Sequence, residues 1–415
     1  MHASDAQRAR AFDLARLDPA FLDDPYPTYH LLRNHDPVHV CPDGSVFVTR
    51  YRDVDAIYRD RRFSSDKKDE FGAKFGDSPL FRHHTTSLVF NDAPLHTRVR
   101  RLMMPAFTPR ALRALEAPLA ALVDRLLDRI AAMGRFDLIA DFAAAIPVQV
   151  IGDLLGVPDG ERGPLRDWSL AILGALEPAP GEDVLRRGND AVRDFSRYLE
   201  GLIARRDGDA AGNNDVLALL RAGRDGERLD PDVLVQNCIF LLNAGHETTT
   251  NLIGNGVAAL MQHPDQLDRL RRCPELIDSA IEEFLRFESS NQLGNRRTLE
   301  AVEIGGAGFP AGTLVTLCIG AANRDPEVFA DPDRLDIARR PNPHLAFGGG
   351  IHTCAGMSLA RMEGRVAIER LVRRFAELEP DGEFRRGGRA RFRGFLAYPM
   401  RVGRDGSRTG ARSRG

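Results

Sequence analysis

The sequence predicts a mainly α protein, with a large helical body around one long central helix and a smaller β-rich portion. Three observations support this fold class. Apolar residues recur at helical spacing in several long segments. One of these segments, from Asp232 to Met261, keeps this spacing over a length that few helices reach. Short strand-like runs, by contrast, are confined to a region near the N-terminus and to the chain beyond residue 296.

The composition is that of a globular protein that can bury a large core, because 43% of the 415 residues are hydrophobic and 28% are charged. No linker with a shift in composition divides the chain, so we expect a single domain over residues 1–403. Residues 404–415, which contain mostly arginine, glycine and serine, are expected to form a disordered C-terminal tail.

The charge and cysteine content exclude several classes of partner. A formal net charge of −2 gives no general attraction to nucleic acid or to an anionic membrane, and we expect neither as a partner. No run approaches the ~20 apolar residues of a membrane span. The five cysteines are scattered and form no C-x-x-C pair, which fits a reducing compartment. We therefore expect a soluble, cytoplasmic protein.

The first elements of the chain are a small hairpin and a loop. Apolar residues alternate in Val38–Val40 and Ser45–Thr49, on either side of the turn residues Pro42–Gly44. Residues 64–94 carry charges, glycines and adjacent histidines without a clear period. We expect this segment to be a long loop that covers a pocket.

Two long helices follow this loop. Their apolar residues recur at the spacing of a helix face. They are Leu112, Leu115, Leu119, Leu122, Leu126 and Ile130 in the first helix, and Val192, Phe195, Leu199, Leu202 and Ile203 in the second. Residues 207–214, rich in aspartate, glycine and asparagine, predict a solvated connection to the next helix.

The central helix is interrupted by the polar run Ala244–Thr249. Gly245 weakens a helix and Thr248 can divert a backbone hydrogen bond, so we expect the helix to open here and to leave a groove for a small ligand. Glu247 and Thr248 place a carboxylate beside a hydroxyl, a pair that can relay protons through ordered water. By themselves, these residues also fit a threonine bonded to the carbonyl four residues earlier and a glutamate on a wet face.

The run Phe347–Gly356 is the most informative in the chain, because three glycines precede a cysteine, Cys354, by a few residues. Glycines lack the Cβ atoms that would collide where backbone passes close to a flat macrocycle. The helix formers from Met357 onward place Cys354 just before a helix N-terminus, where the thiolate form is favoured. The run predicts a loop that presents a thiolate to a haem iron, although a lone cysteine in such a turn also fits an inert buried thiol.

The pattern Phe-x-x-Gly-x-x-x-Cys-x-Gly, formed by Phe347, Gly350, Cys354 and Gly356, closely resembles the haem-binding signature of the cytochrome P450 family. Residues 244–249 resemble the acid–alcohol motif of the same family, and Glu283-x-x-Arg286 resembles its Glu-Arg element. In element order the resemblance covers nearly the whole chain. It implies a cytochrome P450 fold, haem b (iron protoporphyrin IX) as the cofactor, and Cys354 as the iron ligand.

The resemblance also implies roles for single residues. Glu247 and Thr248 would deliver protons during oxygen activation. Residues expected to contact the haem are His96, Arg100, Ala244, Arg296, Phe347, Gly348, His352, Cys354 and Gly356. The cations among them, His96, Arg100, Arg296 and His352, would anchor the two propionates. Arg297 could replace Arg296 if the strand register shifted by one residue.

Glu283 and Arg286 stand three residues apart, where they can pair on one helix face. By resemblance, they would stabilise the scaffold around the haem together with a third arginine. That arginine is either Arg334 or Arg339, and the sequence does not decide between them. Substrate contacts are expected from Leu241, Ala244, Gln292 and Leu293.

The chain contains no dinucleotide-binding glycine motif and no four-cysteine iron–sulfur pattern, so electrons must come from another protein. The resemblance implies a ferredoxin and a ferredoxin reductase that draw on NAD(P)H. Six arginines would form a positive docking face for an acidic ferredoxin: Arg98, Arg101, Arg110, Arg113, Arg361 and Arg365. They could equally be ordinary solvated charges.

We expect a haem-thiolate monooxygenase that uses O2 to hydroxylate or epoxidise a small organic substrate, such as a secondary metabolite, terpenoid, fatty acid or aromatic compound. One alternative is a haem protein that kept the fold but does not oxygenate. Another is reductive or isomerising chemistry on the same thiolate loop. The intact acid–alcohol pair, Glu247 and Thr248, favours the monooxygenase.

Overall fold

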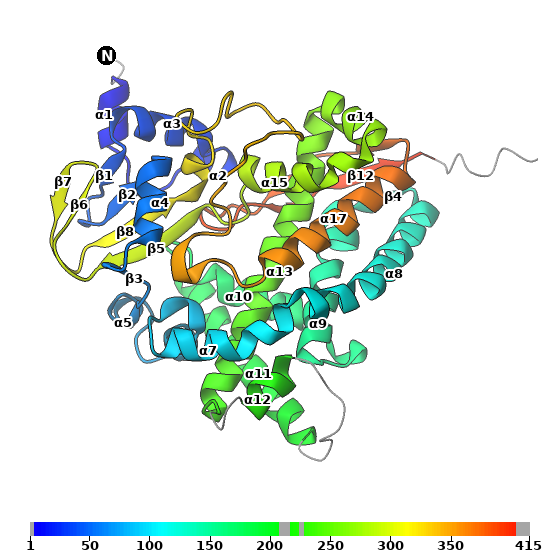
Figure 1. Cartoon of the computed structure of the whole chain (residues 1–415), viewed down its shortest axis with the longest axis horizontal. Helices are drawn as coiled ribbons and strands as arrows, with labels where there is room; N and C mark the ends of the chain where they lie inside the picture. Colours follow the sequence, from blue (N-terminus) through cyan, green and yellow to red (C-terminus); the bar gives the residue numbers. More distant parts are fainter. Residues whose placement is uncertain (1–3, 207–215, 224–227, 404–415) are drawn as a thin grey trace, which may run out of the picture.

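A computed structural model describes residues 4–206, 216–223 and 228–403 and shows a large helical body with a smaller β-rich portion at one side (Figure 1). The mainly α fold class is confirmed. The helices are α1 (Asp5–Arg10), α2 (Pro19–Asp23), α3 (Tyr26–His35), α4 (Tyr51–Arg59), α5 (Lys68–Phe75), α6 (Pro79–Thr86), α7 (Leu95–Met103), α8 (Pro109–Met133), α9 (Ala145–Leu155), α10 (Leu165–Gly174), α11 (Glu182–Arg205), α12 (Val216–Ala222), α13 (Pro231–Gln262), α14 (Pro264–Arg272), α15 (Ile277–Phe287), α16 (Ile319–Ala322) and α17 (Met357–Arg374).

The strands and short helical turns complete the fold. The strands are β1 (Val38–Val40), β2 (Val46–Val48), β3 (Phe63–Ser64), β4 (Arg135–Asp137), β5 (Leu293–Thr298), β6 (Val302–Ile304), β7 (Ala307–Phe309), β8 (Leu314–Cys318), β9 (Leu378–Pro380), β10 (Arg385–Arg386), β11 (Phe395–Ala397) and β12 (Pro399–Val402). The turns are η1 (Leu88–Phe90), η2 (Met104–Phe107), η3 (Leu138–Ala143), η4 (Asp159–Glu161), η5 (Pro274–Leu276) and η6 (Gly350–His352).

The central helix α13 is confirmed. It begins after Asp230, whose side chain accepts a hydrogen bond from the Asp232 amide, and Pro231 occupies its first position. It ends at His263, just before Pro264. Helices α9, α10, α11, α15 and α17 pack around it, which explains why most of its side chains are buried. The largest hydrophobic core cluster lies along this helix.

The expected opening of this helix at Ala244–Thr249 is wrong, because α13 is continuous through these residues. The Thr248 hydroxyl donates to the Ala244 carbonyl oxygen at 2.7 Å, a bond that a helix accommodates without breaking. Gly245 has a packing role instead. A Cβ at this position would lie 2.5 Å from the Ile151 side chain on α9, so the glycine allows the two helices to approach.

The main sheet has the strand order β1-β2-β8-β5-β3. The expected hairpin is confirmed, since β1 and β2 pair antiparallel with Val38 opposite Val48. Strand β2 then pairs parallel with β8, which pairs antiparallel with β5. Smaller sheets are formed by β4-β12-β9, β10-β11 and β6-β7. The main sheet brings β5 to the side of the helical body, next to the segment before α17 (Figure 1).

The prediction of a long loop over residues 64–94 is wrong, because this segment contains α5, α6 and η1. Ser78 caps α6 by accepting from the Phe81 amide, and Pro79 occupies the first position of the helix. Both helices have only eight residues, too few to show a clear hydrophobic period. Residues 207–214 and 404–415, expected as a connection and a tail, lie entirely outside the described residues, so the boundary at residue 403 stays a prediction.

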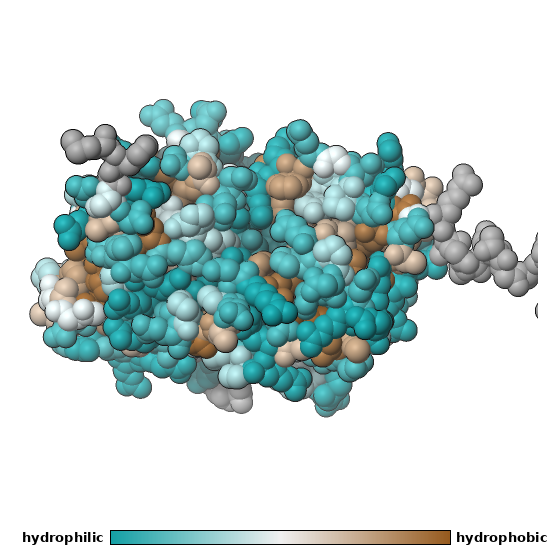
Figure 2. Space-filling view, turned by 90° about the horizontal axis from the view of Figure 1, so that it is seen from above, coloured by the Kyte–Doolittle hydropathy of each residue, from teal (hydrophilic) through white to brown (hydrophobic). Residues whose placement is uncertain are grey.

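The surface is mostly hydrophilic, with apolar side chains in small separate groups on the face seen in Figure 2. Within the described residues, Leu138–Leu155 is long and apolar enough to cross a membrane, but 67% of this stretch is buried inside the protein. That degree of burial is the property of a core helix.

Candidate active site

The cysteine loop packs against the end of α4. Gly348 and Gly350 have left-handed φ angles of 65° and 67°, which favour glycine. A Cβ at Gly350 would lie 2.2 Å from the Tyr58 carbonyl oxygen, and one at Gly349 would lie 3.0 Å from the Tyr58 Cβ. The packing of the loop against α4 therefore requires the glycines. From the sequence alone, the only reason for them is the close approach of the backbone to a macrocycle.

Cys354 is a half-buried free thiol two residues before Gly356, which caps the N-terminus of α17. Its amide donates to the Phe347 carbonyl at 3.0 Å, and this bond closes the loop. Burial raises the pKa of the thiol, while the Gly356 amide, Arg100 and Arg361 act in the opposite direction. These neighbours favour the thiolate, which is the form that binds a metal.

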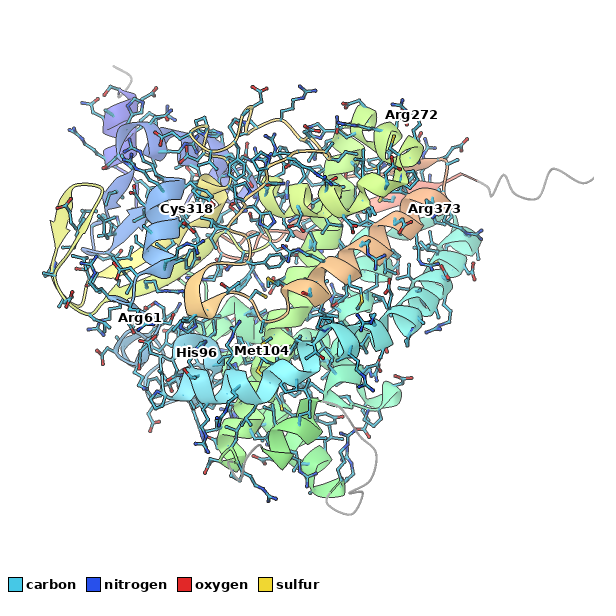
Figure 3. The ribbon with its side chains drawn as sticks, viewed as in Figure 1. Arg61, His96, Met104, Arg272, Cys318 and Arg373 are labelled. Carbon is cyan, nitrogen blue, oxygen red and sulfur yellow. The ribbon has the colours of Figure 1, made fainter. Side chains whose placement is uncertain are left out.

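Four cationic or ionisable side chains from three segments meet beside this loop. His96 lies on α7, beneath the turn that precedes α17 (Figure 3), and its ring centroid is 4.1 Å from that of His352. Arg100 also lies on α7 and donates to the Thr353 carbonyl at 2.8 Å. Arg296 on β5 is 8% exposed, and Asp92, Arg100 and Arg296 all act on the pKa of His96.

Among the described residues, only His352 of this cluster has a carboxylate at ion-pair distance, that of Asp92. His96 is 3% exposed, yet neither of its ring nitrogens has a hydrogen-bond partner, and neither does Nε2 of His352. Burial, then the nearby His352 and Arg100, lowers the pKa of His96 to about 4. Buried polar atoms are nearly always hydrogen-bonded in native proteins. The cluster is therefore built to receive an acidic group.

Sequence reasoning missed Asp92, which precedes α7. Its Oδ1 lies 3.7 Å from Nε2 of His352, and its other oxygen accepts from the Ser64 hydroxyl. Burial acts to raise its pKa, but the nearby His352 and the hydrogen bond from Ser64 outweigh this and lower the pKa to about 2. Asp92 thus holds a negative charge at the edge of the cluster. The acidic residue just before a Pro-x-His run was the available signal.

The middle of α13 faces open space on one side. Ala244 is exposed, although its neighbours Asn243 and His246 are 3% and 1% exposed. Thr248, one turn later, is half-buried. Its hydroxyl is bonded to the Ala244 carbonyl, so both polar atoms border the same space.

Glu247 follows Ala244 by three residues and points toward Arg389, which also contacts α10. It is 6% exposed and forms an ion pair with Arg389, in which Nη1 lies 2.6 Å from Oε1. Its Oε2 has no hydrogen-bond partner, and the residue lines a cavity of about 30 Å³ together with His246, Asn251 and Arg389. Such a cavity holds one or two water molecules. Burial raises the pKa of Glu247 to about 7, although Arg389 acts against this shift.

Comparison with known proteins decides the family. The sequence profile of the family "Cytochrome P450" matches residues 176–272 and 275–386, which together are about half of the chain. The chain belongs to the cytochrome P450 family.

Related cytochromes P450 cover most of this chain. The vitamin D(3) 25-hydroxylase of Pseudonocardia autotrophica is 42% identical over 358 residues, which span 85% of this chain and 86% of the relative. The biotin biosynthesis cytochrome P450 of Bacillus subtilis (strain 168) is 37% identical over 365 residues, 86% of this chain and 91% of the relative. The crystal structure of CalO2 superposes with a TM-score of 0.89 at 35% identity and covers 95% of this chain and 99% of its own.

Cytochromes P450 are haem-thiolate monooxygenases, and the cofactor of this oxidoreductase is accordingly haem b. The residues present fit this group. A free thiol precedes a helix N-terminus, and the cationic cluster beside it leaves buried nitrogens without partners. Buried propionates need such cationic donors. Of the two candidate strand arginines, Arg296 is buried beside His96, whereas Arg297 is half-buried and pairs with Asp69.

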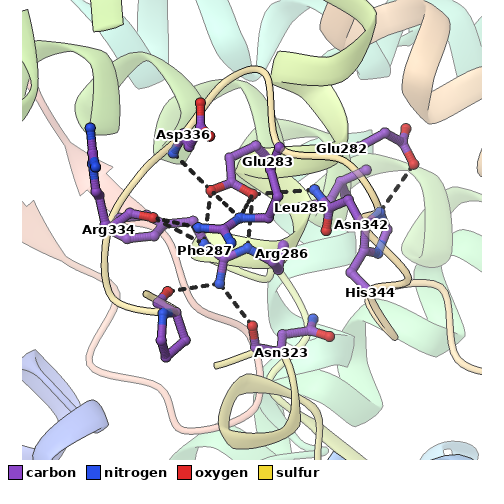
Figure 4. A network of polar contacts seen from close by, with 12 residues as sticks. Glu282, Glu283, Leu285, Arg286, Phe287, Asn323, Arg334, Asp336, Asn342 and His344 are labelled. Carbon is purple, nitrogen blue, oxygen red and sulfur yellow. Dashed lines mark hydrogen bonds and ion pairs between the residues drawn. The ribbon is translucent and has the colours of Figure 1, made fainter. Parts of the chain in front are cut away.

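The scaffold pair forms a fully buried network (Figure 4). Arg286 donates from Nε and Nη2 to the two carboxylate oxygens of Glu283, both at 2.8 Å, and both side chains are 0% exposed. Arg339 closes the network, with its Nε 3.1 Å from Oε2 of Glu283. Arg334 contributes only its backbone carbonyl, which accepts from Arg286 and Arg339. The structure thus selects Arg339 as the third arginine.

Two of the expected substrate contacts are wrong. Leu293 is fully buried in a core cluster with Phe47 and Tyr29, behind the main sheet. Gln292 is also fully buried, and its side-chain amide donates to the Ser289 carbonyl at 2.8 Å. Both side chains serve the packing of the sheet against the N-terminal helices. Leu241 is buried on α13, and its contact with substrate stays a prediction, as does that of the exposed Ala244.

Proposed function

We propose that this cytochrome P450 accepts electrons from a ferredoxin and its NAD(P)H-dependent reductase, and that it hydroxylates or epoxidises a small organic substrate. The observation that carries the proposal is the combination of the Cys354 thiol with an acid–alcohol pair on α13. Cys354 is the proposed axial ligand, and His96, Arg100, Arg296 and His352 are the proposed propionate ligands. Ala244, Phe347, Gly348 and Gly356 would border the macrocycle.

The haem, when bound, supplies the site at which dioxygen is activated, and a thiolate ligand favours cleavage of the O–O bond. The chain's own task is to supply protons to that site. Thr248 borders the open side of α13, and its hydroxyl can hold a water molecule there. Glu247 takes protons from the water-sized cavity beside Arg389, and with a pKa of about 7 it can both accept and donate them near neutral pH.

Arg389 sets the position of Glu247 in this arrangement. The Arg389 guanidinium pairs with the Glu247 carboxylate and also donates to the Leu170 carbonyl of α10 at 3.2 Å. The loop that carries Arg389 is fastened by Glu177, whose Oε2 accepts from the amides of Ala390 and Arg391 at 2.9 and 3.2 Å. The position of Glu247, and with it the proposed proton supply, therefore depends on how α10 and the loop after it pack.

Replacing Arg389 by glutamine is expected to raise the pKa of Glu247 above about 7, because the substitution removes the cation that favours the carboxylate. The other charged or titratable groups near Glu247 are His246, Arg166 and Glu177. Infrared difference spectra over a pH titration, with Glu247→Gln as the reference that assigns the carboxyl band, would show the midpoint move to higher pH. Coupling of NADPH use to product would then reach its half-maximum at the same higher pH.

The matched control is Arg391→Gln in the same loop, since Arg391 donates to the Leu176 and Leu293 carbonyls and not to Glu247. It should leave the infrared midpoint unchanged. Arg389→Lys should restore most of the wild-type midpoint. A midpoint that does not move in Arg389→Gln would show that Arg389 does not control Glu247.

The electron partner is supported by the lack of a flavin or iron–sulfur motif in the chain and by exposed arginines on α7 and α8, including Arg101 and Arg113. Part of the expected positive face is already neutralised. Arg361 pairs with Glu282 at 2.6 Å, and Arg365 pairs with Glu116 at 2.5 Å. These two pairs reduce the positive charge that α17 contributes to the proposed docking face. Five free thiols support a reducing, cytoplasmic setting.

The central test is the reduced carbon-monoxide difference spectrum of the purified protein. The wild type is expected to show the red-shifted band of thiolate ligation, and Cys354→Ser is expected to lose it, because serine cannot supply a sulfur ligand. Cys273→Ser removes another free thiol, which is also half-buried, and should keep the band. A Cys354→Ser protein that keeps the band would refute Cys354 as the ligand.

Oxygen uptake then separates the monooxygenase from a binding-only or isomerising haem protein. A substrate-library screen for the change in haem spin state would identify ligands. With one such ligand, ferredoxin and ferredoxin reductase, the proposal requires that oxygen consumption rise in step with an oxygenated product. Turnover without oxygen uptake would favour reductive or isomerising chemistry.

A further inference from the structure

Tyr58 lies at the junction between the cysteine loop and the strand that carries Arg296. It is the penultimate residue of α4 and is 9% exposed. Its ring packs in the core cluster of the main sheet, with Val54, Ile57 and Leu345. No motif in the sequence marks it, because it is one aromatic residue on a short amphipathic helix.

Glycines lie on two sides of Tyr58, at positions where a side chain would come too close to it. On the loop side, a Cβ at Gly349 would lie 3.0 Å from the Tyr58 Cβ, and one at Gly350 would lie 2.2 Å from its carbonyl oxygen. On the strand side, a Cβ at Gly294 would lie 2.2 Å from the Tyr58 hydroxyl. Real Cβ atoms essentially never lie as close as 2.2 Å, so side chains at Gly350 and Gly294 would collide with Tyr58, and one at Gly349 would be tightly packed. Tyr58 thus fixes how near the loop and β5 come to each other.

The guanidinium of Arg296 lies over the Tyr58 ring in a cation–π contact, with its Cζ 5.0 Å from the ring centroid. Among the described residues, Arg296 has no carboxylate at ion-pair distance, and its Nη1 donates only to the adjacent Asn295 carbonyl, at 2.8 Å. A cation–π contact with a tyrosine ring fixes the orientation of the guanidinium but leaves its positive charge in place. The remaining donors of the guanidinium stay available for an acidic ligand.

We propose that Tyr58 is a positioning residue of the haem site, which holds the propionate arginine with its ring and the thiolate loop with its backbone, and so sets the spacing between the two. This inference rests on the proposed assignment of Arg296 to a propionate. Tyr58 acts through Arg296 and the loop, since nothing requires its hydroxyl to contact the cofactor. Removing the ring should therefore loosen the haem, whereas removing only the hydroxyl should not.

The experiment measures the rate at which the holoprotein releases haem to an excess of apomyoglobin. Tyr58→Leu is expected to release haem about tenfold faster, the scale of a lost, partly desolvated cation–π contact. Tyr58→Phe keeps the ring and should stay within about twofold of the wild type. If Tyr58→Leu does not yield folded holoprotein, Tyr58→Met fills the same space without the ring's negative face and should release haem faster than Tyr58→Phe.

A double-mutant cycle separates positioning of Arg296 from general loss of core packing. In an Arg296→Leu background, Tyr58→Leu should add little further acceleration, because the ring no longer has a guanidinium to hold. In an Arg100→Leu background, Tyr58→Leu should keep its full effect on haem release. Arg100 lies on α7 and donates to the Thr353 carbonyl rather than to the Tyr58 ring.

Equal effects of Tyr58→Leu in the two backgrounds would overturn the proposal, as would a wild-type release rate in Tyr58→Leu itself. If Arg296→Leu alone released haem at the wild-type rate, the propionate assignment would fail and this inference with it. The thiolate band in the carbon-monoxide spectrum reports separately on the proposed function. A protein that shows this band but no coupling between Tyr58 and Arg296 refutes only the role of Tyr58.

Discussion

Replacing Arg286 by methionine is expected to remove most of the stability of the folded protein. The substitution leaves the Glu283 carboxylate fully buried with only Arg339 as a cationic partner. It also removes the Arg286 donors to the Asn323 and Pro332 carbonyls, and it leaves the Arg334 carbonyl with Arg339 as its donor. Breaking a buried ion pair costs about 3–5 kcal/mol. That is a large share of the ~5–15 kcal/mol by which proteins are typically stable.

Urea unfolding of the holoprotein, followed by circular dichroism, would measure this loss as a large drop in the midpoint, or as failure to obtain soluble protein. The matched control is Arg269→Met, because Arg269 pairs with Asp336 in the same region while both side chains are about 40% exposed. Exposed pairs contribute at most ~1 kcal/mol, so this variant should stay close to the wild type. A wild-type midpoint in Arg286→Met would show that the network is not structural.

Replacing Glu363 by glutamine is expected to stabilise the protein at alkaline pH and to have little effect at acidic pH. Glu363 lies on α17, is 1% exposed, and its Oε2 has no hydrogen-bond partner. Burial raises its pKa from 4.5 to about 8. The folded pKa is raised, so between pH 4.5 and about 8 the unfolded state releases this proton while the folded state keeps it. The free energy of unfolding therefore falls across this window.

The shift from 4.5 to about 8 corresponds to at most ~5 kcal/mol at the upper end of the window. Glutamine carries no titratable proton, so the difference in unfolding free energy between the variant and the wild type should grow from near zero at pH 4.5 toward that value at pH 8. Glu369→Gln on the same helix is the control, since Glu369 is part-exposed and pairs with Arg373 at 3.0 Å. A difference between Glu363→Gln and the wild type that did not change with pH would contradict the burial of an ionisable carboxyl here.

The elements that the sequence predicted are those with local signals. The predicted segment Asp232–Met261 agrees with α13 to within one residue at each end, because its length was visible in its apolar spacing. The hairpin was visible in its alternation and turn residues. Helices α5 and α6 were missed because each is short and buries its histidines and aromatic residues among its own neighbours, as His84 does against Phe71 and Phe90.

In the site too, the residues with a local sequence signal were predicted and those that depend on long-range contacts were not. Cys354 and the acid–alcohol pair were predicted because their motifs are contiguous in the chain. The choice between Arg334 and Arg339 depends on how an irregular segment folds back on α15, which no local pattern encodes. Arg389 was missed because it lies 142 residues from Glu247, with which it pairs. Gln292 and Leu293 were misassigned because nearness to Arg296 in sequence does not determine which face of a strand is buried.

The burial of Glu247 against Arg389, while Thr248 borders the open space beside Ala244, has a consequence for the range of compounds that the proposed enzyme can oxidise. A bulky guest that fills the space beside Ala244 would displace water there, whereas the small cavity at Glu247 is lined by neither Ala244 nor Thr248. Variants that enlarge or reshape the guest side can therefore accept new compounds while the route by which protons arrive stays intact.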